Sequence, residues 1–484
     1  MGTFVVQSEK VNSYTRKEKV KLTLRFSGTL LLGISVLFFP GRAISQIENV
    51  EEETILKSVA AAIRESKPKT ALIHLGRIPE SARPLATLSA LYGLALLDCG
   101  EFEMAWQKFD AAGIADPRCP EAKLGCGELE MSLLHWRDAL SLLQQAQTTR
   151  MLPFRAAMAL SQCFMELNQR REALGVLQLL AKNADSLNAR EREGLKRRIK
   201  YLVALGKLGN VDIYAMDNVA PKTQLSFTNH EGHIIIPVTL NGVQVKCHVD
   251  TGNNTGLAID EKTAAALKIE AVAEERIAGV EGEAVAKIGL IHDFQIGEST
   301  IRHVPVDLAD SCLGGAAEAN IGLAILRRFN IFIDYKNKQF VFFRLPQSPH
   351  PPPIIATVSS EIPFRIKPLI IIRAKIDGGP EIPCILDTGA GIPLLDKDYY
   401  SESLKKEAIS ASLFKEKKGL PYLIKTLELG GLIFRNILSV VLDLTPVYET
   451  GSFYIPAIIG ASVLQNTLIR LDFKTMRLSI EIRD

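Results

Sequence analysis

The chain has 484 residues, of which 47% are hydrophobic and 23% are charged, proportions typical of a globular protein. Its formal net charge of +3 is close to neutral for this length, and no stripe of Lys and Arg with interleaved aromatic residues occurs, which argues against a nucleic-acid-binding protein. One hydrophobic core rarely serves a chain of this length, so we expect two to four domains.

The first 45 residues have the pattern of an export signal. Basic residues between Arg16 and Arg25 precede a short apolar run at 26–39, and Ala43-Ile44-Ser45 places small residues where a signal peptidase cuts. We therefore expect a signal peptide at 1–45 and an exported protein, periplasmic or secreted. Alternatively, 26–39 stays uncleaved as an anchor, which would be the contact of the chain with a membrane.

A period of 34 residues runs through 52–185. Four alanines recur at this spacing, each followed four residues later by a large apolar residue; they are Ala71, Ala105, Ala139 and Ala173, followed by Leu75, Phe109, Leu143 and Leu177. Gly93 and Gly127 form a third set of positions with the same spacing. The pattern resembles the tetratricopeptide repeat, in which small residues let paired helices pack closely. The resemblance implies an α-solenoid at 50–210, capped by a helix from Arg190 to Leu208, with a face suited to a protein partner; an unrelated helical bundle is the alternative.

Downstream of the repeats the sequence changes to short β-branched runs separated by Gly and Asn, which predicts mostly-β structure. Two such segments are expected, at 228–346 and 356–484, joined by a proline-rich linker at 347–355. The two segments repeat one another. Each contains an apolar strand, an Asp-Thr-Gly motif, a later apolar-apolar-Gly sequence and a closing strand at matched spacing, which indicates an ancestral duplication.

The two motifs are Asp250-Thr251-Gly252 and Asp387-Thr388-Gly389. Such a tripeptide alone is typical of a turn, but here Ile321-Gly322 and Ile459-Gly460 follow at equivalent distances. The pair of segments resembles the retropepsin-like aspartic proteases, whose signature is a hydrophobic-Asp-Thr-Gly loop with a hydrophobic-hydrophobic-Gly sequence packed beneath it. The resemblance covers roughly half of the chain.

This resemblance implies a multidomain α + β protein, in which two mostly-β lobes follow the α-solenoid and form a pseudodimer. Asp250 and Asp387 would be the catalytic pair, sharing one proton and activating a water molecule to hydrolyse a peptide bond. By the family pattern the supporting residues are Thr251 and Thr388, bonded across the pseudo-twofold axis; Gly252 and Gly389, which let the loops turn; and Ile321, Gly322, Ile459 and Gly460, which pack beneath them. No metal or cofactor is expected, because the sequence has no Cys/His cluster with ligand spacing.

The expected function is therefore an endopeptidase that acts on a protein or peptide substrate, with repeats that recruit a substrate or a regulator. Two alternatives stay open: a non-catalytic scaffold that binds extended peptides, and lobes that dimerise with another chain. A glycine hairpin at 278–282 is typical of a flap, whereas the second lobe carries Lys415–Gly419 in the corresponding interval, which is compatible with one flap or with a degenerate second lobe.

Other repeated residues have structural interpretations. Asp334 and Asp472 precede aromatic residues on the closing strands, where we expect them to end a strand or to bond a turn. Cys247 and Cys384 lie three residues before each aspartate, an odd offset that turns their side chains into the lobe.

Overall fold

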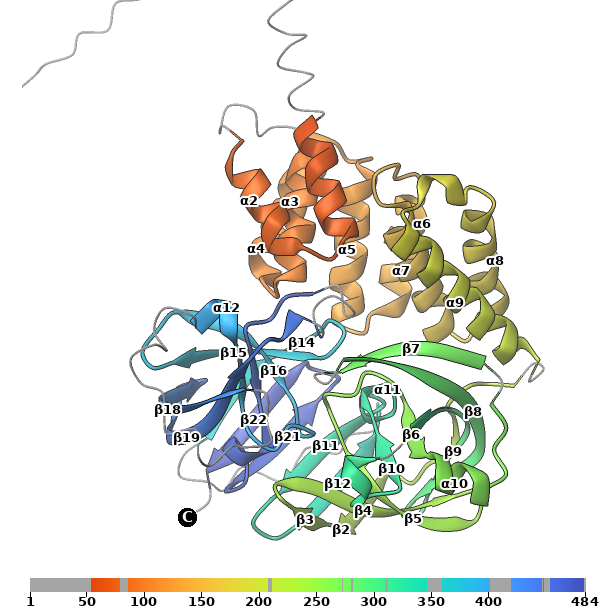
Figure 1. The fold of residues 1–484 in the computed structure, drawn as a ribbon, viewed down its shortest axis with the longest axis vertical. Helices are drawn as coiled ribbons and strands as arrows, with labels where there is room; N and C mark the ends of the chain where they lie inside the picture. Colours follow the sequence, from red (N-terminus) through yellow and green to blue (C-terminus); the bar gives the residue numbers. More distant parts are fainter. Residues whose placement is uncertain are drawn as a thin grey trace, which may run out of the picture. The chain divides into compact units, whose positions relative to one another are not determined.

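The computed structural model describes most of the chain beyond its N-terminal segment (Figure 1); the described residues are 54–78, 86–207, 211–271, 273–279, 282–309, 312–345, 359–400, 419–445, 447 and 453–482. The predicted signal segment at 1–45 and the proline-rich linker at 347–355 lie outside them. Contacts between residues gather Glu52–Asp484 into one unit. In the part of the chain that the structure describes, no helix is both long and apolar enough to cross a membrane.

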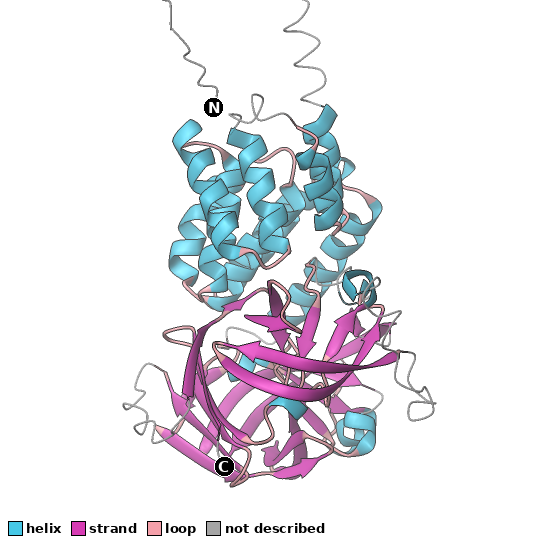
Figure 2. Ribbon diagram, turned by 90° about the vertical axis from the view of Figure 1, so that its left-hand side faces the viewer, coloured by secondary structure: helices cyan, strands magenta, loops and turns pink. Residues whose placement is uncertain are grey.

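The first part of this unit is helical, and the remainder consists mainly of strands (Figure 2). Residues 54–64 are helical, and α3 then packs on α4, α5 on α6 and α7 on α8. Asn188 and Glu191 form a capping box at the start of α9, close to the predicted start of the last helix. The helices are α2 (Pro68–Gly76), α3 (Ala86–Asp98), α4 (Phe102–Ala115), α5 (Pro120–Ser132), α6 (Trp136–Ala146), α7 (Pro153–Glu166), α8 (Arg170–Ala181), η2 (Ala184–Ser186) and α9 (Ala189–Gly206).

The residues that repeat every 34 positions lie in the contacts between helices. All eight have at most 2% of their surface exposed: Ala71, Ala105, Ala139, Ala173, Leu75, Phe109, Leu143 and Leu177. A Cβ atom at Gly93 would overlap the ring of Phe109, and one at Gly127 would lie 2.7 Å from Leu143. Both glycines therefore permit a closer approach of two helices than any other residue would allow. The helices have the predicted periodicity, and their tetratricopeptide-like character stays a prediction.

The first β lobe contains a closed ring of strands. Hydrogen bonding follows the order β9, β6, β10, β5, β4 and β8 and then returns to β9, while β7 extends the sheet beside β8. Its elements are β1 (Ala215–Asn218), β2 (Lys222–Ser226), β3 (Thr228–His230), β4 (His233–Leu240), β5 (Val243–Val249), β6 (Leu257–Asp260), α10 (Glu261–Ala266), β7 (Ala273–Gly279), β8 (Gly282–Ile296), β9 (Ser299–Ala309), η3 (Leu313–Gly315), β10 (Ala319–Ile321), α11 (Leu323–Leu326), β11 (Phe329–Asp334) and β12 (Gln339–Arg344).

The second lobe repeats this ring with equivalent strands. Hydrogen bonding follows the order β19, β17, β20, β16, β15 and β18, and β18 pairs in turn with β19 to close the ring. Its elements are β13 (Ser359–Pro363), β14 (Arg365–Ile366), β15 (Ile370–Ile376), β16 (Glu381–Leu386), β17 (Leu394–Asp396), α12 (Lys397–Tyr400), β18 (Leu420–Leu429), β19 (Leu432–Leu442), β20 (Ala457–Ile459), η6 (Ala461–Val463), β21 (Thr467–Asp472) and β22 (Arg477–Ile482).

A six-stranded sheet joins the lobes, in the order β13, β22, β21, β11, β12 and β2. At its centre β11 of the first lobe pairs antiparallel with β21 of the second, with Ile331 opposite Leu471. Strand β2 at its edge shows that β structure begins upstream of residue 228, the predicted start of the first lobe. Because the sheet takes three strands from each lobe, the lobes share one apolar core, which runs from Val219 to Ile480.

The helices also pack against both lobes. Their apolar core is continuous with residues of the second lobe such as Leu369 and Phe453. Glu166 of α7 forms ion pairs with Arg327 and Arg328, which follow α11 of the first lobe. The helical part and the lobes are therefore held together by apolar and ionic contacts.

A buried ion cluster lies at the contact between the helices and the second lobe. Arg155 lies 2.6 Å from Asp98 and 2.7 Å from Glu128, and Lys367 of the second lobe lies 3.1 and 2.8 Å from the same two carboxylates. Burial alone would raise the pKa of Glu128, but Arg155 and Lys367 together outweigh it and lower the pKa to about 2. The four charges compensate one another, which is the condition for burying them.

Candidate active site

The two Asp-Thr-Gly motifs form equivalent loops at the ends of equivalent strands. Asp250 follows β5, and its backbone N–H donates to the carbonyl of Ile321 on the neighbouring parallel strand, at 3.0 Å. Asp387 follows β16 and donates in the same way to Ile459, also at 3.0 Å. Each apolar-apolar-Gly sequence therefore fixes the start of one loop.

The glycine of each apolar-apolar-Gly sequence lies directly against its loop. A Cβ atom at Gly322 would come 2.7 Å from the carbonyl oxygen of Asn253, and one at Gly460 would lie 2.6 Å from that of Ala390. Real Cβ atoms do not approach backbone oxygens so closely, so both positions require glycine if the loops are to keep their place.

Thr251 and Thr388 connect the two loops. The backbone N–H of Thr251 donates to the Thr388 hydroxyl at 3.1 Å, and that of Thr388 donates to the Thr251 hydroxyl at 3.0 Å. The hydroxyls then donate to the carbonyls of Leu386 and Val249, each at 2.9 Å. Both threonines are at most 1% exposed, so these four hydrogen bonds are shielded from water.

The carboxyls of Asp250 and Asp387 lie against one another. Each accepts the backbone N–H of the glycine in its own loop, from Gly252 at 2.8 Å and from Gly389 at 2.7 Å. Each also lies over the glycine of the opposite loop, because a Cβ atom at Gly252 would overlap the Asp387 carboxyl and one at Gly389 would overlap that of Asp250. Both aspartates are half-buried.

Burial and this juxtaposition together raise the pKa of Asp387. Burial, followed by the negative charge of Asp250, raises the pKa of Asp387 well above its ordinary value, and the backbone N–H groups of Gly389 and Ala390 oppose the shift. Two carboxyls this close cannot both ionise readily, which is the physical cause of the contribution that Asp250 makes to the raised pKa of Asp387.

The surroundings of the two aspartates differ. On the first lobe, Asn320 donates from Nδ2 to Oδ2 of Asp250 at 2.8 Å, and His248 lies in the same network. The equivalent positions of the second lobe are Ile458 and Ile385. Neither Asn320 nor His248 is among the site residues that the two Asp-Thr-Gly motifs predict. An alignment of the two lobes would have found both, since each is a polar residue whose counterpart is isoleucine.

Other predicted features also lie in the described residues. Strands β7 and β8 form the predicted hairpin, with Gly279 paired to Gly282. Its counterpart in the second lobe falls in an interval of which Gly419 alone is described. Asp334 accepts the backbone N–H of Asn337 at 2.9 Å, and Asp472 accepts that of Lys474 at 2.9 Å, so both bond turns.

The cysteines show no metal-type cluster in the described residues. Cys247 and Cys384 are 0% exposed, and burial raises the pKa of each thiol. Their side chains belong to the core of the lobes. The described group with metal-like spacing is Glu130, His135 and Asp138 on the helical part, where Nδ1 of His135 lies within hydrogen-bond distance of Glu130, at 2.8 Å.

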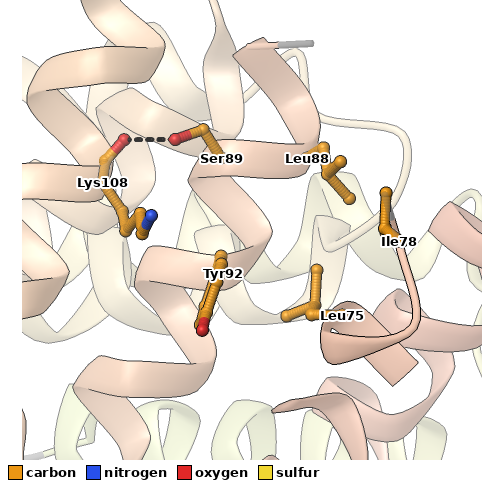
Figure 3. A pocket seen from close by; sticks show the side chains of 6 residues that line it. All are labelled: Leu75, Ile78, Leu88, Ser89, Tyr92 and Lys108. Carbon is orange, nitrogen blue, oxygen red and sulfur yellow. Dashed lines mark hydrogen bonds between the residues drawn. The ribbon is translucent and has the colours of Figure 1, made fainter. Parts of the chain in front are cut away.

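Two small hollows occur among the described residues. One is lined by residues of the helical part, where the Ser89 hydroxyl donates to the Lys108 carbonyl at 2.9 Å (Figure 3). The other is enclosed by the core of the first lobe, including Ile321 and Phe340. Neither is lined by Asp250 or Asp387.

A comparison with protein-family models matches part of the chain. Residues 236–324, which include Asp250 and Gly322, match the family model described as aspartyl protease. Among solved structures, the chain is similar to the aspartic proteinase from Irpex lacteus, with 13% identity, a TM-score of 0.39, and coverage of 54% of this chain and 98% of that chain. The comparison with curated proteins gave no match. The segment that matches the family model contains the first Asp-Thr-Gly loop and the apolar-apolar-Gly sequence that packs against it.

Proposed function

We propose that this protein is an aspartic endopeptidase with a single active site formed by Asp250 and Asp387. The observation that carries the proposal is the contact between two half-buried carboxyls, each placed over the glycine of the opposite loop. Adjacent like charges are unfavourable, and a protein that only binds peptides has no use for them. A carboxyl pair that shares one proton is, by contrast, able to activate water.

In the proposed reaction, water binds between the two carboxyls. The ionised carboxylate accepts a proton from the water as the water oxygen bonds to the carbonyl carbon of the scissile peptide. The protonated carboxyl gives its proton to the carbonyl oxygen. The tetrahedral intermediate then collapses: the carboxyl that took the water proton gives it to the amine nitrogen, the C–N bond breaks, and a hydroxyl of the intermediate returns its proton to the other carboxylate, which restores the starting state of the pair. The threonine bonds hold the two carboxyls in this geometry, so little reorganisation accompanies the reaction.

We assign the enzyme to the retropepsin-like type, with an intrachain pseudodimer of the lobes at 228–346 and 356–484. Equivalent rings of strands and the shared six-stranded sheet support this assignment. The shared sheet also favours pairing within one chain over pairing with another, because β11 and β21 of the same chain already complete it.

We propose further that the helices at 50–210 are tetratricopeptide-like repeats that recruit a protein substrate or a regulator. Their periodic helix pairs support this role. Because the buried ion cluster attaches the helices to the second lobe, a protein bound there would stay near the active site at a high local concentration.

The sequence of the first 45 residues supports an exported protein that acts in the periplasm or outside the cell. A reporter that functions only after export, fused to residues 1–50, tests this. Activity with a mature N-terminus near Gln46 is expected, whereas full-length chain in the membrane fraction would indicate an anchor.

The experiment that tests the enzymatic proposal uses the purified chain and a library of peptides. Cleavage is expected with the wild type and should be lost in both Asp250→Asn and Asp387→Asn, which preserve the shape of each side chain. Statine-type inhibitors, which imitate the tetrahedral intermediate, should block cleavage. Peptides bound without cleavage by the wild type and by both variants would instead indicate a non-catalytic scaffold.

A further inference from the structure

A chain of oriented amide groups leads to one of the two aspartates. The backbone N–H of Thr255 donates to Oδ1 of Asn253 at 2.9 Å, and the Thr255 hydroxyl donates to the same atom at 2.8 Å. Nδ2 of Asn253 donates to Oδ1 of Asn320 at 3.2 Å, and Nδ2 of Asn320 donates to Oδ2 of Asp250 at 2.8 Å.

The direction of this chain is fixed at its start. A backbone N–H can only donate, so the oxygen of Asn253 must face Thr255 and its NH₂ group must face Asn320. The oxygen of Asn320 then faces Asn253, and the NH₂ group of Asn320 is left to face Asp250. Because every bond points the same way, each polarises the next one.

The second lobe has no equivalent of this chain. By the duplication, Asn253, Thr255 and Asn320 correspond to Ala390, Ile392 and Ile458, none of which has a polar side chain. Both Ile392 and Ile458 are at least partly buried. Asp250 therefore accepts a hydrogen bond from a side-chain N–H group, that of Asn320, whereas the equivalent position beside Asp387 is an isoleucine.

We propose that Asn320 is a positioning residue that keeps Asp250 as the ionised member of the pair, so that the shared proton lies on Asp387. A donor that cannot accept stabilises a carboxylate more than it stabilises a protonated carboxyl. The chemical roles then follow: Asp250 accepts the proton of the attacking water, and Asp387 donates its proton to the carbonyl oxygen. This assignment rests on the proposed function.

The other titratable groups around Asp250 leave this assignment in place. Asp387 faces it from the opposite loop, and His248 from β5 lies in the same network. His233 of β4 meets His248 edge to face, with ring centroids 5.0 Å apart. Burial lowers the pKa of His248 to about 4, against the opposing effect of Asp250, so its ring is neutral at higher pH and Asn320 supplies the donor.

The test is the titration of the two carboxyls in the full chain, measured by ¹³C NMR with labelled aspartate and assigned with Asp250→Asn and Asp387→Asn. In the wild type the lower titration should belong to Asp250. In Asn320→Leu, which keeps the size and removes the donor, it should move up by about one pH unit, the order of shift that one such bond produces. The acid limb of the pH dependence of kcat should move to higher pH together with this titration, while KM stays near the wild-type value.

Ile458→Leu is the matched control, because it changes the equivalent position beside Asp387 and should leave the lower titration in place. Asn253→Ala keeps Asn320 but removes the group that orients it, so it should give a smaller shift in the same direction and serves if Asn320→Leu does not fold. In a chain that already carries His248→Gln, Asn320→Leu should move the lower carboxyl titration by the same amount as in the wild type.

The inference is overturned if the carboxyl that titrates at lower pH is Asp387, or if this titration does not move in Asn320→Leu and Asn253→Ala. It is also overturned if the acid limb of the pH profile of kcat moves in His248→Gln and not in Asn320→Leu. The NMR titration needs no substrate, so it tests the assignment of the proton independently of activity. If the carboxyl titrations shift as predicted but no peptide is cleaved, the proposed function is refuted and the assignment of the proton still holds.

Discussion

Thr251 and Thr388 exchange hydrogen bonds in both directions, each backbone N–H donating to the hydroxyl of the other residue. The two residues are 137 positions apart in the chain. Their bonds join the loop of one lobe to the loop of the other immediately beside the two aspartates. The geometry of the candidate site therefore depends on an interaction that neither lobe can make alone.

Removing one hydroxyl should weaken the whole site. Thr388→Val keeps the shape of the side chain but leaves the N–H of Thr251 and the carbonyl of Val249 buried without a partner. We expect a loss of about 2 kcal/mol or more in the free energy of unfolding, measured by denaturant titration, since each buried unsatisfied group costs about 1–3 kcal/mol. Thr388→Ser retains the hydroxyl and should lose less. Equal stabilities of the valine variant and the wild type would contradict the role of these bonds.

Gly389→Ala should abolish peptide cleavage. Its Cβ atom would occupy the space of the Asp250 carboxyl, so one carboxyl of the pair must move. We expect kcat/KM to fall by about 100-fold or more, because small displacements of catalytic groups cost this much. The control is Gly175→Ala on α8, where a Cβ atom meets nothing within 4 Å and helix propensity favours alanine. Cleavage by Gly389→Ala at the rate of this control would exclude the proposed geometry.

The packing of the helices can be tested at Gly93. A Cβ atom there overlaps the buried ring of Phe109, so Gly93→Ala should lower the free energy of unfolding by about 1–3 kcal/mol, the usual cost of overpacking. Gly113→Ala, on α4 beside open space, should be neutral or slightly stabilising. If the two variants unfold at the same denaturant concentration, the close approach of α3 and α4 is wrong.

The ion cluster predicts a specific loss of stability in acid. The pKa of Glu128 is lowered from 4.5 to about 2 in the folded protein, so the unfolded chain takes up this proton first as the pH falls. Its stabilising contribution is complete above about pH 4.5 and is lost progressively towards pH 2. Glu128→Gln should flatten the dependence of the melting temperature on pH in this window. An unchanged acid slope in this variant would show that Glu128 does not carry the effect.

The sequence predicted those features that repeat. The registers of Ala105 and Phe109 fell in the helix contacts because packing imposes the same spacing on every unit. The two Asp-Thr-Gly loops met because each apolar-apolar-Gly sequence pairs with its own strand, as in Ile321 and Ile459. Asp334 and Asp472 were predicted to end a strand or to bond a turn, and both bond the backbone of the following turn.

What the sequence did not predict lacks a local pattern. Asp98, Glu128 and Lys367 come together from distant parts of the chain, and charged residues on helices ordinarily face solvent. Strand β2 was not predicted because its alternation of buried and exposed residues spans only five positions, and one of the buried residues, Thr223, is polar. Asn320 precedes the predicted Ile321 by one residue, and its importance depends on Asn253, which lies 67 positions away.

The central claim is that one chain contains one complete site, and mixing two inactive variants tests it most directly. Asp250→Asn and Asp387→Asn are purified separately, combined in equal amounts, and assayed for cleavage of a peptide that the wild type hydrolyses. Because the two aspartates of each molecule face one another, every chain in the mixture keeps one damaged site, and the mixture should be as inactive as either variant alone. Recovery of activity on mixing would show that the aspartates pair between chains and would contradict the intrachain site.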